Sequence, residues 1–191
     1  MKNVIKLLVA SAALVMVTGC SINHPVAKDY PAFLEKNADT VVLPETMMDA
    51  DYLVEKTTQG HRYEFRAATV GYAHLWIVEF GKILDETLNA PYVQQSFTRL
   101  DKQLDGKSSN GHLIQFTLEN YEFKNYRAYV SLKVDVMINQ QVSSSQVYSA
   151  EGVSKGGKMW LAGPFGMKNA TLESTKSALD KILIEFIKDI Q

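Results

Sequence analysis

Cysteine is almost absent from this chain, because Cys20 is the single cysteine among 191 residues. One cysteine can form no disulfide bond within the chain, so a packed core must stabilise the fold. The length lies within the usual range for one domain and is sufficient to bury such a core. The sequence therefore excludes a small scaffold held together by disulfide bonds.

An excess of charge of one sign is also missing. The chain has 20 Lys and Arg residues against 21 Asp and Glu residues, a formal net charge of −1. Proteins that capture nucleic acid electrostatically have a strongly basic face, which this balance does not predict. No polybasic segment follows Cys20 that could reinforce attachment to a membrane. We therefore expect no nucleic-acid partner.

Metal-ligand spacing is lacking as well. The four histidines are His24, His61, His74 and His112. No two of them have the spacing of a metal-ligand pair, and the chain has no second cysteine to form a thiolate pair. A lone histidine is more often a surface or satisfied polar residue than a metal ligand. The acidic cluster of Asp49, Asp51 and Glu55 lacks the spacing of a calcium loop and is interpreted as a solvated face. The sequence predicts no metal site and no cofactor.

Familiar catalytic motifs are not found in the sequence. There is no G-x-S-x-G, S-x-x-K, H-E-x-x-H or P-loop pattern, which are the common signatures of hydrolases and nucleotide-binding proteins. The segment from Gly163 to Lys168 has neither the spacing of a phosphate loop nor a Ser or Thr after the lysine. We therefore predict that the protein is not an enzyme.

What the sequence does contain is an apolar run at its N-terminus. Lys2 and Lys6 precede an apolar stretch of eleven residues, Leu7 to Val17. A transmembrane helix needs ~20 apolar residues, whereas the core of a signal peptide needs only about 7 to 15. Residues 1–19 are therefore predicted to be a cleaved secretory signal.

The residues that follow this run, Val17-Thr18-Gly19-Cys20, resemble the bacterial lipobox. In that motif the lipoprotein signal peptidase cuts before the cysteine, and the resemblance implies a covalent diacylglyceryl group and an N-acyl chain such as palmitate on Cys20. The alternative is an ordinary secretory peptide with an accidental cysteine. Ser21 replaces the Asp that, by the sorting rule of enteric-type bacteria, retains lipoproteins in the inner membrane. The resemblance therefore implies anchoring in the outer membrane, on the periplasmic side, with the inner membrane as the weaker alternative.

Three segments follow from this division. Residues 1–19 are the lipoprotein signal peptide, residues 20–39 the lipidated N-terminus and a flexible tether, and residues 40–191 a single α+β domain. Pro25 and Pro31 disfavour regular structure in the polar segment after Cys20, which suggests a tether. Removing the signal leaves 172 residues with 18 basic and 21 acidic side chains, a mild charge of −3.

The first half of the domain is expected to contain two strands and a helix. The β-branched run at residues 40–43, which Pro44 ends, predicts a first strand near a sheet edge. Alternation from His61 to Ala67 predicts a half-buried second strand. Apolar residues at spacings of three and four from Gly71 to Leu88 predict an amphipathic helix that includes Trp76. Residues 45–60 show no clear period, and residues 92–103 fit a strand or a helix equally well.

The second half has the clearest pattern. From Ala128 to Ile138 every second residue is apolar, which predicts a strand with one buried face. Similar alternation before it and a polar strand after it, joined at 124–125 and 139–141, predict a three-stranded antiparallel meander. A final amphipathic helix begins at a cap on Asn169 or Thr171 and carries apolar residues to Ile190. We expect an α+β two-layer sandwich, with a mixed, mostly antiparallel sheet and two amphipathic helices on one face.

Residues 154–168, predicted to form a loop, place five large apolar side chains among glycines and a proline: Met159, Trp160, Leu161, Phe165 and Met167. Such side chains on a glycine-rich segment can anchor a partner, which makes them candidate contact residues. They can equally fold back over the core as an edge strand or cover.

The order of these features is similar to that of YajG-like lipoproteins and ABC-transport auxiliary lipoproteins. Its parts are the lipobox, the tether, an early strand, a first helix that bears Trp76, the three-stranded meander and the amphipathic C-terminal helix. The resemblance implies a non-enzymatic accessory or adaptor subunit of a cell-envelope transport or assembly complex, with an envelope protein as partner. The alternative function is a module that binds a lipid or other apolar ligand between the helices and the sheet.

Overall fold

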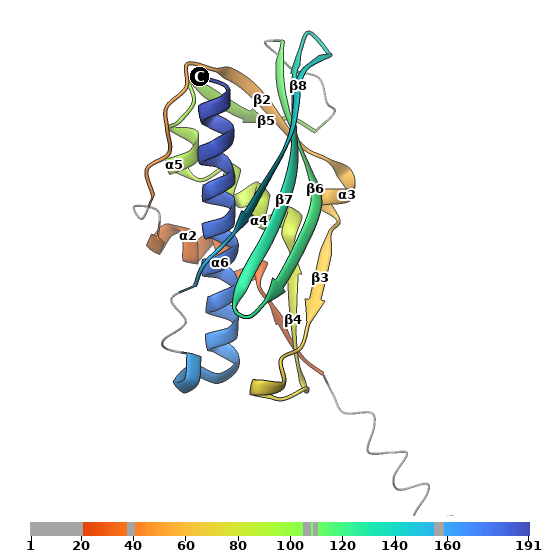
Figure 1. Cartoon of the computed structure of the whole chain (residues 1–191), viewed down its shortest axis with the longest axis vertical. Coiled ribbons are helices and arrows are strands. Elements are labelled where there is room, and N and C mark those ends of the chain that lie inside the picture. The colour runs from red at the N-terminus through yellow and green to blue at the C-terminus, as the bar shows by residue number, and fades with distance from the viewer. Residues whose placement is uncertain (1–20, 38–40, 105–107, 109–110, 155–158) are drawn as a thin grey trace, which may run out of the picture.

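The structure, a computed structural model, describes residues 21–37, 41–104, 108, 111–154 and 159–191, the side chains of 159–162 excepted. It contains two mixed sheets and several helices, which confirms the predicted α+β sandwich (Figure 1). Cys20 and the whole predicted signal peptide lie outside the described residues. Among the described helices, none is both long and apolar enough to cross a membrane.

The larger sheet has five strands in the order β5-β2-β6-β7-β8. Its members are β5 (Arg99–Lys102), β2 (Asp49–Val54), β6 (His112–Lys124), β7 (Arg127–Ile138) and β8 (Gln141–Glu151). β6, β7 and β8 are antiparallel, as the alternation predicted, whereas β2 pairs in parallel with both β5 and β6. Both hairpins turn through two residues with positive φ, which suits the twist of antiparallel strands: Asn125, Tyr126, Asn139 and Gln140.

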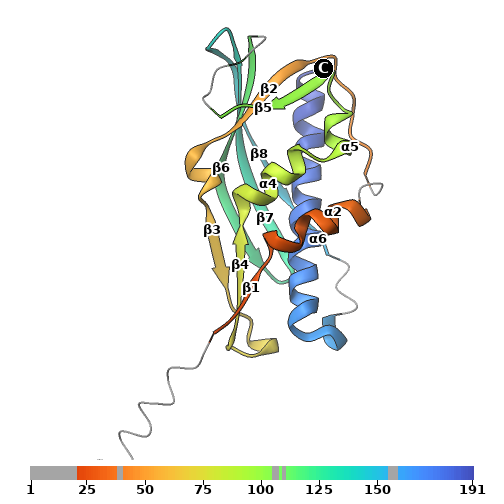
Figure 2. The same ribbon diagram turned by 180° about the vertical axis from the view of Figure 1, so that it is seen from behind.

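The smaller sheet has three strands in the order β1-β4-β3. β1 (Ile22–Pro25) pairs in parallel with β4 (His74–Glu79), and β3 (Arg62–Phe65) pairs with β4 on its other side. Figure 2 shows β1 alongside β4, with α2 (Tyr30–Asn37) beyond the end of β1. The segment next to Cys20 is therefore part of the sheet.

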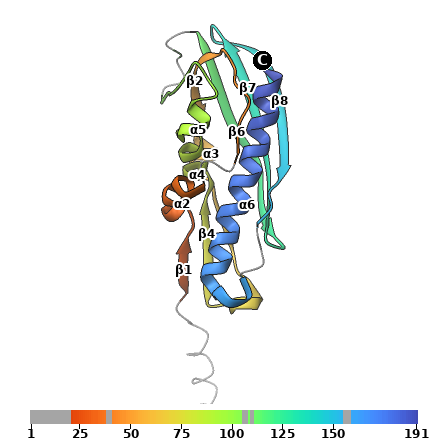
Figure 3. The ribbon, with the colours of Figure 1, turned by 90° about the vertical axis from the view of Figure 1, so that its left-hand side faces the viewer.

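Helices close the core on one side of the meander. α6 (Met159–Asp189) packs against β7 and β8 (Figure 3). Its Phe186 ring contacts the rings of Phe116 in β6 and Tyr148 in β8. α4 (Phe80–Leu88) follows β4 directly and buries most of its side chains. The short helices α3 (Lys56–Gln59) and α5 (Pro91–Gln94), with η1 (Ala27–Asp29) and η3 (Ala68–Val70), join these elements.

The predicted tether is wrong for residues 22 to 37, which form β1, η1 and α2. Val26, Tyr30 and Leu34 follow one another at a spacing of four and are all buried. The Tyr30 hydroxyl also lies 2.8 Å from the Thr87 hydroxyl of α4. Pro31 does not prevent the helix because it occupies the first turn, where the missing N–H has no partner in a helix.

The strand predicted at residues 40–43 is not found at its described positions, and Val42 is 91% exposed. The strand of this region is β2, within the stretch that showed no period. Ala50, Asp51 and Tyr52 are all buried, because β2 is flanked by strands on both sides and covered on both faces. A strand buried in this way does not alternate between apolar and polar residues.

The helix predicted over 71–88 is wrong in its first half, since Trp76 lies in β4 and the helix begins at Phe80. The strand His61–Ala67 is confirmed as β3. The ambiguous stretch 92–103 contains the end of α5 and then β5.

The loop predicted over 154–168 is wrong from Met159 onward, because α6 begins there. Gly163 interrupts the helix with a φ of 52° and a ψ of −131°, and Pro164 starts the continuous part. Asn169 and Thr171 are therefore not caps, and Thr171 donates from its hydroxyl to the carbonyl of Met167 one turn earlier. Gly-Pro marks a break within a helical segment here rather than a loop.

Candidate functional site

The predicted contact residues do not form one surface. Phe165 is 72% exposed, whereas Met167, two residues later, is 3% exposed and belongs to the core. The side chains of Met159, Trp160 and Leu161 lie outside the described part of the structure, as does Cys20. Of the predicted partner-contact residues with described side chains, Phe165 alone faces solvent.

Phe165 lies at the end of the domain where the chain enters β1. We name this region the Ile22 end; it comprises Ser21, Ile22, Arg66, Tyr72 and Phe165. Figures 1 and 3 show the start of β1, the yellow connection from β3 to β4 and the start of α6 at the lower end of the molecule, and in Figures 1 and 2 the yellow connection lies between the other two. The three large exposed side chains of the Ile22 end come from three separate segments: Ile22 at 49%, Tyr72 at 70% and Phe165 at 72% exposure.

Hydrogen bonds fix these segments to one another. The Arg66 guanidinium donates to the Ser21 hydroxyl at 3.1 Å and also to the backbone carbonyl of Tyr72. The backbone N–H of Ile22 donates to the Ala73 carbonyl at 2.8 Å. On the α6 side, Trp76 Nε1 donates to the Pro164 carbonyl at 3.4 Å. The residue that follows Cys20 is therefore joined directly to the folded domain.

Next to this end the structure brings together two histidines whose spacing in the sequence does not predict a pair. His24 Nε2 and His74 Nδ1 share a hydrogen bond of 2.7 Å, although the residues are 50 positions apart. In the parallel pairing of β1 with β4, His24 is opposite Trp76 and diagonal to His74. The His24 ring also stacks on Trp76 with a centroid distance of 5.4 Å. Burial, followed by repulsion from His74 and Lys168, lowers the pKa of His24. Within the described residues there is no group of three or more side chains suited to hold a metal ion.

An aromatic row extends from this histidine pair across both sheets. Phe65 lies 5.4 Å from Trp76 and 4.8 Å from Phe123 between ring centroids, and the Tyr63 ring meets Tyr121 at 5.2 Å. A hollow of about 400 Å³ opens between η3 and the β6–β7 hairpin, and we name it the Phe65 groove. Its lining combines aromatic and apolar side chains with the charged residues Arg66, Lys124 and Glu122. Such a lining suits an apolar ligand with a polar end.

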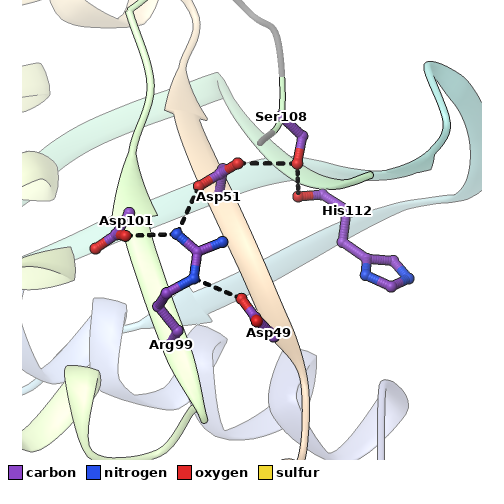
Figure 4. A network of polar contacts seen from close by, with 6 residues as sticks. All are labelled: Asp49, Asp51, Arg99, Asp101, Ser108 and His112. Atoms are coloured by element: carbon purple, nitrogen blue, oxygen red, sulfur yellow. Dashed lines mark hydrogen bonds and ion pairs between the residues drawn. The ribbon is translucent and has the colours of Figure 1, made fainter. Parts of the chain in front are cut away.

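The prediction that Asp49, Asp51 and Glu55 form a solvated face is wrong for Asp51 alone, since the Asp49 side chain is 50% exposed. Asp51 has 0% exposure, and Figure 4 shows it between Arg99 and Ser108. Arg99 donates to Asp49 at 2.6 Å and to Asp51 at 3.1 Å, and it also contacts Asp101. These ion pairs join neighbouring strands β5 and β2, and they raise the pKa of Arg99.

Two further residues complete the cluster. The Ser108 hydroxyl lies 2.9 Å from Asp51 Oδ2 and 2.7 Å from the carbonyl of His112, at the start of β6. The third predicted member, Glu55, is elsewhere and accepts hydrogen bonds from the backbone N–H groups of Thr57 and Thr58 as the N-cap of α3. The cluster therefore holds β5, β2 and the start of β6 in register.

A second polar cluster is buried between α5 and α6. Lys176 donates to Asp180 at 2.7 Å, one turn along α6, and both side chains are more than nine-tenths buried. The Tyr92 hydroxyl donates to the other oxygen of Asp180 at 2.8 Å, and the Lys176 ammonium lies 4.6 Å from the centre of the Tyr92 ring. Burial and the neighbouring Asp180 carboxylate raise the pKa of Tyr92. All three groups are satisfied by one another, as a structural contact requires.

The described contacts thus define an α+β sandwich whose polar clusters join strands and helices. No protein-family model matches the sequence, and no curated protein matches it. Among solved structures, the chain is similar to protein XCC0632 from Xanthomonas campestris, of the family DUF330. The similarity has a TM-score of 0.48 and 12% sequence identity, over 76% of this chain and 84% of that chain. A similarity of this size establishes neither a common fold nor a common function.

Proposed function

We propose that the protein is a non-enzymatic lipoprotein of the cell envelope, lipidated on Cys20 and anchored in the outer membrane on the periplasmic side. In this proposal it is an adaptor subunit of an envelope transport or assembly complex. The lipobox-like Val17-Thr18-Gly19-Cys20 and the following Ser21 support the anchor. The adaptor role rests on a surface of the larger sheet.

The observation that carries the adaptor role is the edge strand β8. It is the last strand of its sheet, and within the described structure no strand pairs with its outer edge. Gln141 to Val147 are exposed, including Val142 at 60% and Val147 at 53%. Soluble proteins usually protect such an edge with lysine, proline or a very short strand. β8 has eleven residues, no proline and no lysine, and Glu151 is its one charged residue.

An unprotected edge can accept an extended segment of a partner by β-strand addition. The register between β7 and β8 shifts near the hairpin, where Val136 pairs with Ser144 and Met137 with Val142. The regular part of the edge therefore begins at Ser144. A partner strand would pair from Ser144 toward Tyr148 and place its apolar side chains near Val147.

A photo-crosslinking residue at position 147, in the full-length protein expressed in cells, tests this role. We expect it to crosslink to a defined envelope protein, and Val147→Lys, which places a charge on the edge, should reduce the amount of that complex co-purified. Met47→Lys is the matched control, because Met47 is 92% exposed and lies away from the sheet edge. Equal recovery with both lysine variants, or no crosslink at position 147, would contradict the adaptor role.

The anchor has its own test. Cys20→Ser should release the protein from the membrane fraction without changing the described fold, because Cys20 precedes the first strand. Membrane attachment that is unchanged in Cys20→Ser would refute lipidation as its cause.

A second function, binding of a lipid or other apolar ligand, is supported by the Phe65 groove. Its aromatic lining and its volume of about 400 Å³ suit part of an acyl chain, and Arg66 and Lys124 are cations at its margin. Thr69→Trp should fill the groove without disturbing the core, since Thr69 is exposed. Native mass spectrometry should then show a co-purifying lipid in the parent protein and its loss in the variant. Equal lipid content in both proteins, or none in either, counts against this function.

A further inference from the structure

We propose that the Ile22 end lies on the bilayer surface, with Ile22, Tyr72 and Phe165 inserted among the lipid headgroups. This inference rests on the proposed lipid anchor at Cys20. It replaces the picture of a domain on a flexible tether with a domain seated directly on the membrane in a fixed orientation.

The first argument is distance. A single residue, Ser21, separates Cys20 from Ile22, and an extended chain spans at most about 3.3 to 3.6 Å per residue. The Cα atom of Ile22 is therefore within about 7 Å of that of the lipidated cysteine. Ile22 cannot move away from the domain, because its N–H is bonded to Ala73 and β1 is paired with β4.

That distance is comparable with the headgroup layer. A bilayer of about 40 to 45 Å contains a hydrocarbon core of ~30 Å, which leaves roughly 5 to 8 Å of headgroup region on each side. A cysteine whose acyl chains are in the core holds Ile22 within or next to that layer. The hydrogen bonds from Arg66 to Ser21 and Tyr72 bring the connection before β4 to the same level.

The second argument is the chemistry of the exposed side chains. Ile22, Tyr72 and Phe165 are about half to three-quarters exposed, and the three segments that carry them lie at the same end of the molecule (Figure 1). Tyrosine is favoured at membrane–water interfaces, where its ring is apolar and its hydroxyl remains hydrated. The exposed Arg66 adds a cation beside them, which suits contact with lipid phosphates.

The third argument is the position of the other functional surface. The hairpin between β7 and β8 and the C-terminus lie at the opposite end of the long axis from β1 (Figure 1). A domain seated on the Ile22 end therefore directs the C-terminus and the hairpin that begins β8 away from the membrane. The proposed membrane contact of the Ile22 end is therefore compatible with the proposed binding of a partner strand at β8.

Depth-dependent fluorescence quenching tests the proposed contact of the Ile22 end with the bilayer, in the lipidated, full-length protein. Tyr72→Cys and Phe165→Cys are labelled with an environment-sensitive dye, since the thiol of Cys20 is consumed by lipid in the proposed protein. Each is reconstituted into vesicles of phosphatidylethanolamine and phosphatidylglycerol that contain a spin-labelled phosphatidylcholine. Val142→Cys is the matched control, because Val142 is similarly exposed and apolar but lies on the far hairpin.

We expect at least twofold stronger quenching at positions 72 and 165 than at position 142, together with a blue-shifted emission. Vesicle flotation is measured on the same samples. Protein that floats with the vesicles but shows equal quenching at all three positions would overturn the contact of the Ile22 end with the bilayer, and the proposed lipid anchor would stand. An Ile22 end that binds a protein partner instead of lipid would give this result. Protein that does not float with the vesicles overturns the proposed anchor and the bilayer contact with it.

Discussion

Removing the buried charge of Asp180 should destabilise the domain more than removing an exposed charge on α6. The change Asp180→Asn keeps the volume of the side chain but leaves the Lys176 ammonium, which is 4% exposed, without its carboxylate. Breaking a buried ion pair by removing one partner costs about 3 to 5 kcal/mol. The Tyr92 ring remains 4.6 Å from the ammonium and offsets part of that cost, so we expect about 3 kcal/mol.

That loss can be converted into a melting temperature. About 170 residues, each with an unfolding entropy near 2.1 cal/mol/K, give about 0.36 kcal/mol/K for the domain. A destabilisation of about 3 kcal/mol then lowers Tm by roughly 8 °C. Circular dichroism during heating, with urea unfolding at neutral pH, measures both quantities on the parent and the variant.

Two matched variants separate charge burial from general damage to the helix. Glu185→Ala changes an exposed acidic residue on the same helix and should stay within about 0.5 kcal/mol of the parent. The double variant Lys176→Met/Asp180→Asn removes both charges, keeps an amide oxygen as acceptor for the Tyr92 hydroxyl, and should recover most of the stability lost by Asp180→Asn. A loss below about 1 kcal/mol in Asp180→Asn, or a double variant less stable than the single one, would refute the reasoning.

Two further predictions concern packing and pH. Gly152→Ala should cost at least about 3 kcal/mol, because a Cβ there would lie 1.7 Å from the backbone oxygen of Ser174 in α6. Gly60→Ala, whose Cβ meets nothing closer than 3.7 Å, should change urea stability by less than about 1 kcal/mol. Equal effects of the two substitutions would contradict the close approach of Gly152 to α6. Since the folded pKa of His24 is below the usual 6.5, the unfolded chain binds a proton first as the pH falls, so stability should decrease below about pH 6.5. His24→Gln should weaken that decrease between pH 7.5 and 5.5, whereas an unchanged pH dependence would show that His24 does not contribute to it.

The meander could be predicted from the sequence because local pattern and tertiary environment agree there. Alternate residues from Ala128 to Val136 face the core, and the Asn residues at the hairpins tolerate the positive φ that two-residue turns require. Both signals are contained in neighbouring residues.

β4 could not be predicted in the same way. Ala73, Ile77, Phe80 and Leu84 fit a helical spacing, and β4 is a strand because β1 and β3 supply its hydrogen-bonding partners. The partner β1 is about 50 residues away, so nothing in the local pattern indicates it. Secondary structure that depends on distant pairing is where sequence periodicity misleads.

The candidate site shows the same limit. The pairing of His24 with His74 follows from the register of two parallel strands, and no spacing in the sequence indicates it. By contrast, the apolar spacing of Val26, Tyr30 and Leu34 was visible in the sequence, and all three are buried. The two nearby prolines led instead to the prediction of a tether. Of the apolar residues singled out at 159–167, Phe165 is exposed as a contact residue requires, while Met167 is buried.

The parallel pairing of β1 with β4 also determines how the domain bears mechanical load. A pull on Cys20 away from the domain acts along β1, whose four residues pair with His74 to Ile77. In this geometry the inter-strand hydrogen bonds lie across the direction of force, and all of them must fail together rather than one after another. Because Val26 and Tyr30 are fully buried directly behind the strand, extraction would also have to draw them out of the core. If Cys20 carries the proposed lipid anchor, β1 would transmit in shear any force between that anchor and the far end of the molecule.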